Sequence, residues 1–394
     1  MSGNIGDSTP PGSDGPPLAK FAPAGYSLKL HDLELVKTLG AGSFARVVLV
    51  RTRNLEFKHP CVKPGALMAM KIIKKSVLPT EGVGNVGLLR YGEMVDNERN
   101  VLTRLPWHPF IAGHIAAFED PLNLYHLLEL LPCGNLRAHL KRYAPFDREL
   151  ACFYFANVVS GLQFLHAHNI AHRDIKPENI LLQQDGYVCI ADFGHAAVYE
   201  VGKTVKARIG TPWYTAPEVI ARARADAVDL PYTMDWWALG ITLYEMVSGT
   251  LPFRVCNNGR PFDGSDPDDH NMPELFRLIE TTGIVWCKEV IWYEHCIDII
   301  CGLLRKDPRH RLSATKFERS LLDHPWLANV NWKMMRTHTY DAPYLPLEPH
   351  HEHKWQTWYR PTQAEIPGLP IANVPPHKLY SDCFLPSPTY RIGT

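Results

Sequence analysis

The sequence predicts an α+β fold of two lobes, a small β-rich N-terminal lobe with one main helix and a larger, mainly helical C-terminal lobe. Between residue 28 and about residue 130, short β-type runs alternate with turns and a single helical stripe. From 131 to 327, longer apolar segments with helical spacing dominate. A chain of 394 residues is ample for two lobes that share a cleft.

The two ends of the chain differ in composition from the lobes. Residues 1–27 are rich in Gly, Pro and Ser and almost lack large apolar side chains, so we expect a disordered N-terminal arm. Residues 328–394 hold many prolines with spaced aromatic residues. That pattern favours an extended tail lying on the lobes over a further domain.

The charge balance and the cysteine content indicate which classes of partner and which cellular compartment to expect. The 41 basic and 41 acidic side chains cancel, so no overall field attracts nucleic acid or an anionic membrane. The nine cysteines are odd in number and form no C-x-x-C pair, which disfavours a disulfide framework and a zinc site. No apolar run approaches the ~20 residues that span a bilayer. We expect an intracellular protein, cytoplasmic with the nucleus as an alternative, without nucleic-acid or membrane partners.

The first two β-type runs flank a glycine-rich turn. The turn reads Gly40-Ala41-Gly42-Ser43-Phe44-Ala45, and the β-branched run Val47-Val48-Leu49-Val50 follows it. A dinucleotide-binding turn would open a helix at this point, whereas here a strand follows. The glycines are therefore expected in a strand-turn-strand hairpin.

The third strand, 66–73, contains Lys71 as its only charge. A lysine buried by such neighbours needs an anion, although a lysine that snorkels from an edge strand is an alternative. The helix expected over 93–105 carries Glu98, either as the partner of Lys71 or as a solvated charge. Two further strands are expected at 115–118 and 124–131.

The C-terminal lobe contains a polar octapeptide, His172-Arg173-Asp174-Ile175-Lys176-Pro177-Glu178-Asn179, between the expected helix 151–168 and the run Ile180-Leu181-Leu182. It places a carboxylate, an ammonium and a carboxamide within one loop. Such a set can orient a hydroxyl, neutralise a moving phosphoryl group and hold a magnesium ion. Taken alone, the octapeptide could also be a charged surface turn.

The octapeptide resembles the catalytic loop of eukaryotic protein kinases, H-R-D-x-K-P-x-N, at all six fixed positions. Other motifs of that family follow in its usual order: Ala69-Met70-Lys71, Asp192-Phe193-Gly194, Gly210-Thr211-Pro212 and Ala216-Pro217-Glu218. Residues 28–327 therefore resemble a serine/threonine protein kinase domain with its bilobal fold. The amino-acid sequences of several motifs most resemble those of the cyclic-AMP-dependent and related AGC kinases.

The resemblance implies ATP and Mg²⁺ as cofactors and assigns roles to individual residues. Asp174 would orient the substrate hydroxyl, and Lys176 would stabilise charge on the transferred group. Lys71, held by Glu98, would position the phosphates. Asn179 and Asp192 would hold the metal. The residues expected to contact ATP, with the backbone of the two hinge residues facing adenine, are Leu39, Gly40, Gly42, Val47, Ala69, Lys71, Glu129, Leu131 and Leu181.

Three further positions are assigned by the resemblance. Asp235 would hydrogen-bond the backbone of the catalytic loop, and a helix N-cap is an alternative that is compatible with it. Arg311 would pair with Glu218. His114 falls at a position of the regulatory hydrophobic spine that is usually aliphatic in the family.

The leading hypothesis is a kinase that phosphorylates protein Ser and Thr hydroxyls; its regulatory partner is unknown. The runner-up is a pseudokinase that serves as a binding scaffold, suggested by Ala45 in place of a third glycine and by His114. A small-molecule kinase is disfavoured by the complete segment from Gly210 to Glu218, which would build a platform for an extended peptide.

Substrate choice and activation are also addressed by the resemblance. Glu178 and Glu245 match two acidic positions that read arginines before the target in cyclic-AMP-dependent kinase, so we expect a weak preference for a basic context.

In relatives a phosphorylated Thr or Ser stands where this chain has Ala207. We favour ordering of the activation segment without phosphate over phosphorylation of Thr204.

Overall fold

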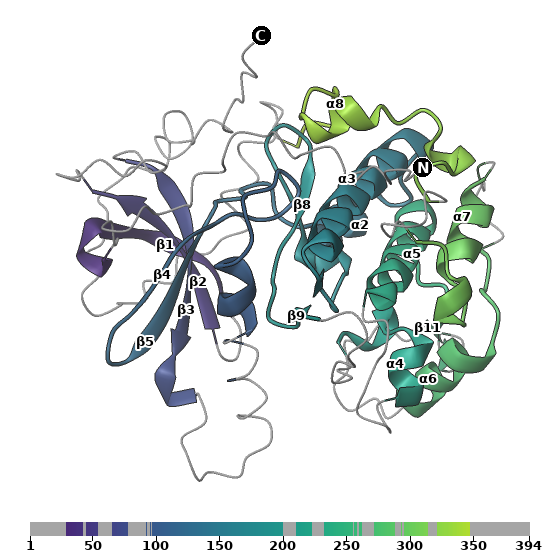
Figure 1. The fold of residues 1–394 in the computed structure, drawn as a ribbon, viewed down its shortest axis with the longest axis horizontal. Coiled ribbons are helices and arrows are strands. Elements are labelled where there is room, and N and C mark those ends of the chain that lie inside the picture. The colour runs from purple at the N-terminus through teal and green to yellow at the C-terminus, as the bar shows by residue number, and fades with distance from the viewer. Residues whose placement is uncertain are drawn as a thin grey trace, which may run out of the picture.

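The structure is a computed structural model that describes residues 29–41, 45–53, 65–77, 92, 95, 97–199, 210–222, 232–254, 256–257, 260–261, 272–287, 293, 295–313 and 321–346. Within these residues the chain forms two lobes, one built around a twisted sheet and the other around helices (Figure 1). Each lobe has its own hydrophobic core. The α+β, bilobal fold expected from the sequence is confirmed.

The N-terminal lobe contains a five-stranded antiparallel sheet in the order β1-β2-β3-β5-β4. The strands are β1 (Leu33–Ala41), β2 (Ala45–Thr52), β3 (Leu67–Lys74), β4 (His114–Glu119) and β5 (Asn123–Leu128), with 3-10 turns η1 (Leu30–Asp32) and η2 (Lys75–Val77). The expectation that the last strand continues to residue 131 is wrong. It ends at Leu128 because the chain leaves the sheet there and crosses to the C-terminal lobe.

The expected glycine hairpin is formed by β1 and β2. Gly40 pairs with Val47 across the two strands, and Val47 in turn pairs with Lys71 of β3. The register therefore places the strand after the turn directly beside the strand that carries the lysine. Gly42 lies outside the described residues.

The C-terminal lobe is organised around two long helices, α3 and α5 (Figure 1). Asp147 caps α3 by accepting a hydrogen bond from Leu150 N at 2.8 Å, and Gly249 ends α5 with a φ of 72° that favours glycine. All 16 residues of α5 are buried. The helices of this lobe are α2 (Leu136–Tyr143), α3 (Arg148–Ala167), α4 (Pro217–Arg222), α5 (Thr233–Ser248), α6 (Met272–Thr281), α7 (Cys296–Leu303) and α8 (Trp332–Arg336).

Short strands and 3-10 turns connect these helices. The strand pairs are β6–β9, β7–β8 and β10–β11. Their bounds are β6 (Ile170–Ala171), β7 (Ile180–Leu182), β8 (Val188–Ile190), β9 (Ala197–Val198), β10 (Cys256–Asn257) and β11 (Arg260–Pro261). The turns are η3 (Pro177–Asn179), η4 (Pro212–Tyr214), η5 (Pro308–His310) and η6 (Pro325–Leu327).

Helix α3 is the one described helix that is long and apolar enough to cross a membrane, with a mean hydropathy of 1.3. Because 78% of that apolar window is buried inside the protein, its apolarity is explained by its place in the core.

The chain after η6 packs against the β7–β8 hairpin. The hydroxyl of Tyr187 donates to the carbonyl of Tyr340 at 2.6 Å, and the rings of Tyr187 and His338 stack with centroids 4.0 Å apart. Gly186 has a φ of 84°, and a Cβ there would overlap the carbonyl of Tyr344. This segment therefore rests directly on the C-terminal lobe.

Candidate active site

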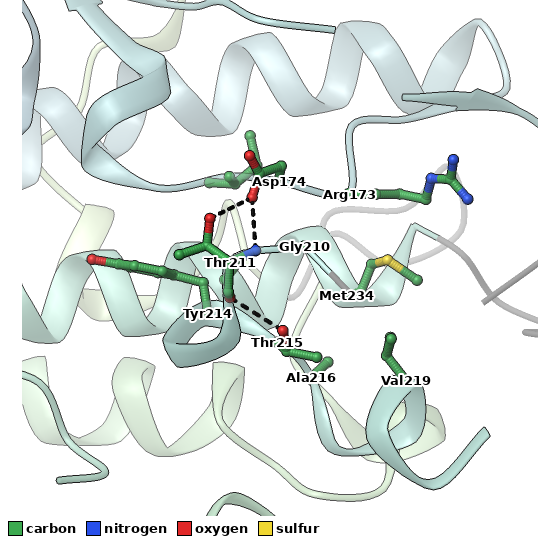
Figure 2. Close-up of a pocket in the computed structure, with 11 residues that line it drawn as sticks. Arg173, Asp174, Gly210, Thr211, Tyr214, Thr215, Ala216, Val219 and Met234 are labelled. Carbon is green, nitrogen blue, oxygen red and sulfur yellow. Dashed lines mark hydrogen bonds between the residues drawn. The ribbon is translucent and has the colours of Figure 1, made fainter. Parts of the chain in front are cut away.

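The Asp174 carboxylate lies at the centre of the candidate site, in the loop between β6 and β7. Its Oδ2 accepts hydrogen bonds from Lys176 Nζ at 2.7 Å and from Asn179 Nδ2 at 3.0 Å. Its Oδ1 accepts from the backbone N–H of Thr211 at 3.1 Å and from the Thr211 hydroxyl at 2.9 Å (Figure 2). The carboxylate is therefore fixed by four donors from two separate segments.

Thr211 ties the activation segment to the catalytic loop. Its hydroxyl accepts from Lys176 Nζ at 2.6 Å while it donates to Asp174. The preceding Gly210 leaves room for this contact, since a Cβ on it would lie 2.9 Å from the carbonyl oxygen of Arg173 and 3.0 Å from Asp174 Oδ1. A glycine is thus required for the segment to approach the loop this closely.

Asp235 of helix α5 fixes the backbone of the catalytic loop through hydrogen bonds. This fully buried residue accepts from His172 N at 2.9 Å and from Arg173 N at 2.7 Å, and it also bonds His166 Nε2 at 2.8 Å. Arg173 has a φ of 66°, which is uncommon for a residue with a side chain. Asp235 lies in the first turn of α5, and the N-cap position belongs to Tyr232, which makes no side-chain capping hydrogen bond, so the alternative that Asp235 is the N-cap is wrong.

The second group of charges joins the two lobes. Lys71 Nζ on β3 lies 2.6 Å from Glu98 Oε2 and 3.5 Å from Asp192 Oδ1. Glu98 belongs to a helical segment of which residues 97–102 are described, and its side chain is 4% exposed. The structure thus brings Lys71, Glu98 and Asp192 together from three distant parts of the sequence.

Burial and charge pairing act in opposite directions on these carboxyl groups. Burial would raise the pKa of Asp174, but the Lys176 ammonium and its hydrogen bond hold that pKa below its usual value. Burial would also raise the pKa of Asp192, but the nearby Lys71 charge lowers it, and the net result is a lowered pKa. At the more deeply buried Glu98, burial outweighs Lys71 and the pKa is raised.

The model of the protein kinase domain matches residues 33–327 of this chain. The chain belongs to the protein kinase family. The kinase domain thus spans both lobes and contains every element that positions the charges described above.

Relatives of this kinase domain are AGC-type enzymes, which confirms the expected group. The chain is 33% identical over 319 residues to the cAMP-dependent protein kinase catalytic subunit of Arthrobotrys oligospora, covering 80% of this chain and 54% of that protein. It is 33% identical over 317 residues to the serine/threonine-protein kinase sgk-1 of Caenorhabditis elegans, covering 80% and 60%. It is 30% identical over 319 residues to protein kinase C of Drosophila melanogaster, covering 80% of this chain and 38% of that protein. The match thus spans only about half the length of these relatives.

The residues expected to contact ATP come from both lobes of the kinase domain. Val47 and Ala69 lie on the adjacent strands β2 and β3, and Leu181 on β7 bridges to Asn135 at the start of α2. Leu39 and Gly40 belong to β1, and Glu129 and Leu131 lie between β5 and α2.

The backbone N–H of Glu129 in the hinge is already paired within the protein. The backbone N–H of Glu129 donates to the carbonyl of Gly113 at 2.9 Å, and its buried carboxylate accepts from Gly113 N at 3.2 Å. Of the Glu129 backbone, only the carbonyl oxygen could therefore accept a hydrogen bond from adenine. Burial raises the pKa of this carboxyl group.

A second ion pair stabilises the C-terminal lobe of the kinase domain. Arg311, whose side chain is 0% exposed, donates through Nη1 and Nη2 to the two Glu218 oxygens at 2.5 and 2.8 Å. The pair expected from the sequence is therefore present. It joins the end of the activation segment to the chain after α7.

The catalytic loop also holds the start of the activation segment. Arg173 points away from Asp174 (Figure 2), and its Nε donates to the carbonyl of His195 at 2.6 Å. Residues 200–209, which include Thr204 and Ala207, lie outside the described residues. The expectation of phosphate-independent ordering therefore stays a prediction.

Two pairs of aromatic rings lie at the positions expected for the hydrophobic spine and beside it, and the place of His114 in the spine stays a prediction. The rings of His172 and Phe193 pack edge to face with centroids 5.2 Å apart, and His114 lies 5.7 Å from His126. Burial lowers the pKa of His114 and of His126 to about 4 each, so both are neutral at physiological pH.

Sequence reasoning missed two residues of the site. His195, directly after Gly194, has its Nδ1 3.7 Å from Asp174 Oδ2. Its position beside a recognised motif was a usable signal. Arg137 of α2 bonds Glu178 and Glu245, which are 41 and 108 residues away in sequence. Nothing in the sequence indicates that contact, because Arg137 stands among other basic residues on a polar helix.

Proposed function

We propose that the chain transfers the γ-phosphoryl group of ATP to Ser and Thr hydroxyls of proteins. One observation carries the proposal: the Asp174 carboxylate is held by Lys176, Asn179 and Thr211 in a loop of a protein kinase domain. One of its relatives is a serine/threonine-protein kinase of Caenorhabditis elegans, which supports the choice of acceptor.

Asp174 is the group that receives the substrate hydroxyl. Its lowered pKa keeps it ionised at neutral pH, so it can accept the hydroxyl hydrogen and direct the oxygen toward the phosphorus. Lys176, which bonds both Asp174 and Thr211, places a positive charge where negative charge develops on the transferred group.

The donor set of Asn179 and Asp192 fits Mg²⁺. Asn179 donates with its Nδ2 to the carbonyl and the carboxylate of Asp174, which leaves its Oδ1 for a cation. Within the part of the chain that the structure describes, no cluster of three or more His, Cys, Asp or Glu residues could hold a metal. A site with one carboxylate and one amide oxygen suits Mg²⁺, which prefers oxygen ligands and needs few of them from the protein. Asn179 and Asp192 would hold such an ion, which would supply positive charge against the phosphate groups.

Lys71 is positioned to hold the remaining phosphates. Glu98, in the helical segment 97–102, lies 2.6 Å from the Lys71 ammonium and fixes its position. Strand β2, which follows the glycine hairpin, pairs with the strand that carries Lys71. The ammonium can therefore contact phosphate without a side-chain rearrangement, which is the benefit of preorganisation.

The test is a transfer assay with radiolabelled ATP, Mg²⁺ and an arrayed peptide library, followed by identification of the phosphorylated amino acid. The proposal predicts phosphoserine and phosphothreonine and no phosphotyrosine. Label that appears only on tyrosine, or binding of Mg²⁺ and ATP without any transfer to peptide, would refute it.

A further inference from the structure

The side chain of Arg137 is partly buried and contacts two glutamates beside the catalytic loop. Its Nε donates to Glu178 Oε1 at 2.7 Å, and its Nη1 and Nη2 contact both oxygens of Glu245, the Nη2 contact at 3.2 Å. Nη2 also donates to the hydroxyl of Tyr214, which itself donates to Glu245 Oε2 at 2.6 Å. We call these four residues, Arg137, Glu178, Tyr214 and Glu245, the arginine cluster.

The arginine cluster adjoins the site where the target residue must bind. Glu178 lies in the catalytic loop next to Asn179, and Tyr214 belongs to η4, which begins directly after Thr211. Both segments bond the Asp174 carboxylate. A peptide whose hydroxyl reaches Asp174 therefore passes within reach of Glu178, whose side chain is 40% exposed.

The two glutamates are already paired within the chain. A guanidinium that binds a carboxylate through two N–H groups forms the strongest common type of charge-assisted pair, and Arg137 does so with Glu245. Burial would lower the pKa of Arg137, but its interactions with Glu245, Tyr214 and Glu178 together raise that pKa, so Arg137 stays charged at all physiological pH values. Arg137 thus cancels one of the two negative charges that would attract a basic substrate side chain, and it already bonds three of the four carboxylate oxygens of Glu178 and Glu245.

Helix α2 holds Arg137 in place. Asn135 caps the helix by accepting from Ala138 N at 3.0 Å, and Leu136 and Leu140 are buried in the core of the lobe. Because Arg137 is part of the same molecule, its effective concentration at the glutamates is at least of millimolar order, far above that of a micromolar substrate. A substrate arginine would have to displace it.

We propose that Arg137 is a specificity-determining residue that occupies the acidic subsite in place of a substrate arginine, so that the enzyme accepts substrates without a basic residue there. The inference rests on the proposed kinase activity and narrows its substrate class. It also replaces the weak basic preference expected from Glu178 and Glu245. Glu178 Oε2 is buried without a hydrogen-bond partner among the described residues, so removal of Arg137 leaves acceptors ready for a new guanidinium.

The experiment measures kcat/KM for paired peptides that carry either arginine or alanine at each position before the target Ser or Thr. For the unaltered protein we expect a ratio of arginine to alanine peptide within about threefold of one. In Arg137→Ala and in Arg137→Met, which keeps the packing of the side-chain stem, the ratio should rise by at least about tenfold through a lower KM, since a charge-assisted hydrogen bond is worth that much.

Two controls separate specificity from structure. Arg142→Ala removes one positive charge from an exposed position of the same helix and should leave the ratio unchanged. Adding Glu178→Gln to Arg137→Ala should lower the acquired ratio again, because one of the two carboxylates is lost. If Arg137 had only a structural role, its replacement would slow both peptides equally.

The inference is overturned if the unaltered protein already prefers arginine by about tenfold, or if an active Arg137 variant shows no increase in the ratio. Should both Arg137 variants fail to fold, Glu178→Gln in the otherwise unaltered chain decides: equal effects on both peptides support the inference, and a loss confined to the arginine peptide overturns it. Absence of transfer to every peptide by the unaltered protein instead refutes the proposed function itself, and with it this inference.

Discussion

Asp235 is the residue whose replacement should reveal how the helical lobe holds the catalytic loop. Its buried carboxylate accepts from the backbone N–H groups of His172 and Arg173 and bonds His166. In Asp235→Ala these donors lose their acceptor inside a closed core. Arg173 can then leave its unusual φ of 66°, and the neighbouring Asp174 moves with it.

The magnitude follows from the number of unpaired groups. Each buried donor without an acceptor costs about 1–3 kcal/mol, and two backbone N–H groups are affected. Release of the left-handed backbone returns roughly 1 kcal/mol. We therefore expect the free energy of unfolding to fall by about 3 kcal/mol. A displacement of Asp174 of about 1 Å should lower kcat by about 100-fold.

Urea denaturation and steady-state kinetics measure the two effects. Asp235→Asn, which retains one oxygen acceptor, should show a smaller loss of stability than Asp235→Ala. Asp323→Ala is the matched control, because Asp323 is exposed and makes no hydrogen bond or ion pair among the described residues, so its loss should change the free energy of unfolding by less than about 0.5 kcal/mol. The reasoning is refuted if Asp235→Ala retains normal stability and kcat, or if the control is equally harmful.

Three further predictions concern single side chains. Lys71→Met should reduce transfer at least about 100-fold, because the charge that holds phosphate is lost, and retained turnover in a radiolabel assay would contradict this. Thr211→Val should slow transfer by about tenfold, since the hydroxyl that joins Lys176 to Asp174 is removed; an unchanged kcat would argue against that link. His114 has a pKa of about 4 in the folded state, below its ordinary 6.5, so the unfolded state binds the proton first and stability falls as pH drops from 6.5 toward 4. His114→Leu should flatten that part of a stability-against-pH curve measured by thermal unfolding, and an unaltered curve would count against the assignment.

The parts of the site that sequence reasoning could predict are those with short contiguous patterns. A single lysine in an apolar strand implied a buried anion, and the structure places Glu98 at that point. The octapeptide 172–179 likewise carried its chemistry in adjacent residues. The hairpin of β1 and β2 could be predicted because glycines flanked by β-branched residues favour that turn.

The remainder depends on contacts between distant segments. The expected partners of a substrate arginine, Glu178 and Glu245, were recognised, but their internal partner Arg137 was not, since no periodicity links residues of α2 and α5. The end of β5 at Leu128 was missed for a similar reason, because the apolar run continues after the chain has left the sheet.

The most direct test of the central claim compares phosphate transfer and ATP affinity in Asp174→Asn. The carboxamide occupies the same space but carries no charge with which to orient the hydroxyl, and Asp174 belongs to the acceptor side of the site. We predict that γ-phosphate transfer to a peptide substrate is abolished, while the Kd of ATP, measured by calorimetry in the presence of Mg²⁺, changes by no more than a few fold. Turnover by the variant at even roughly a tenth of the wild-type rate would contradict the role assigned to Asp174.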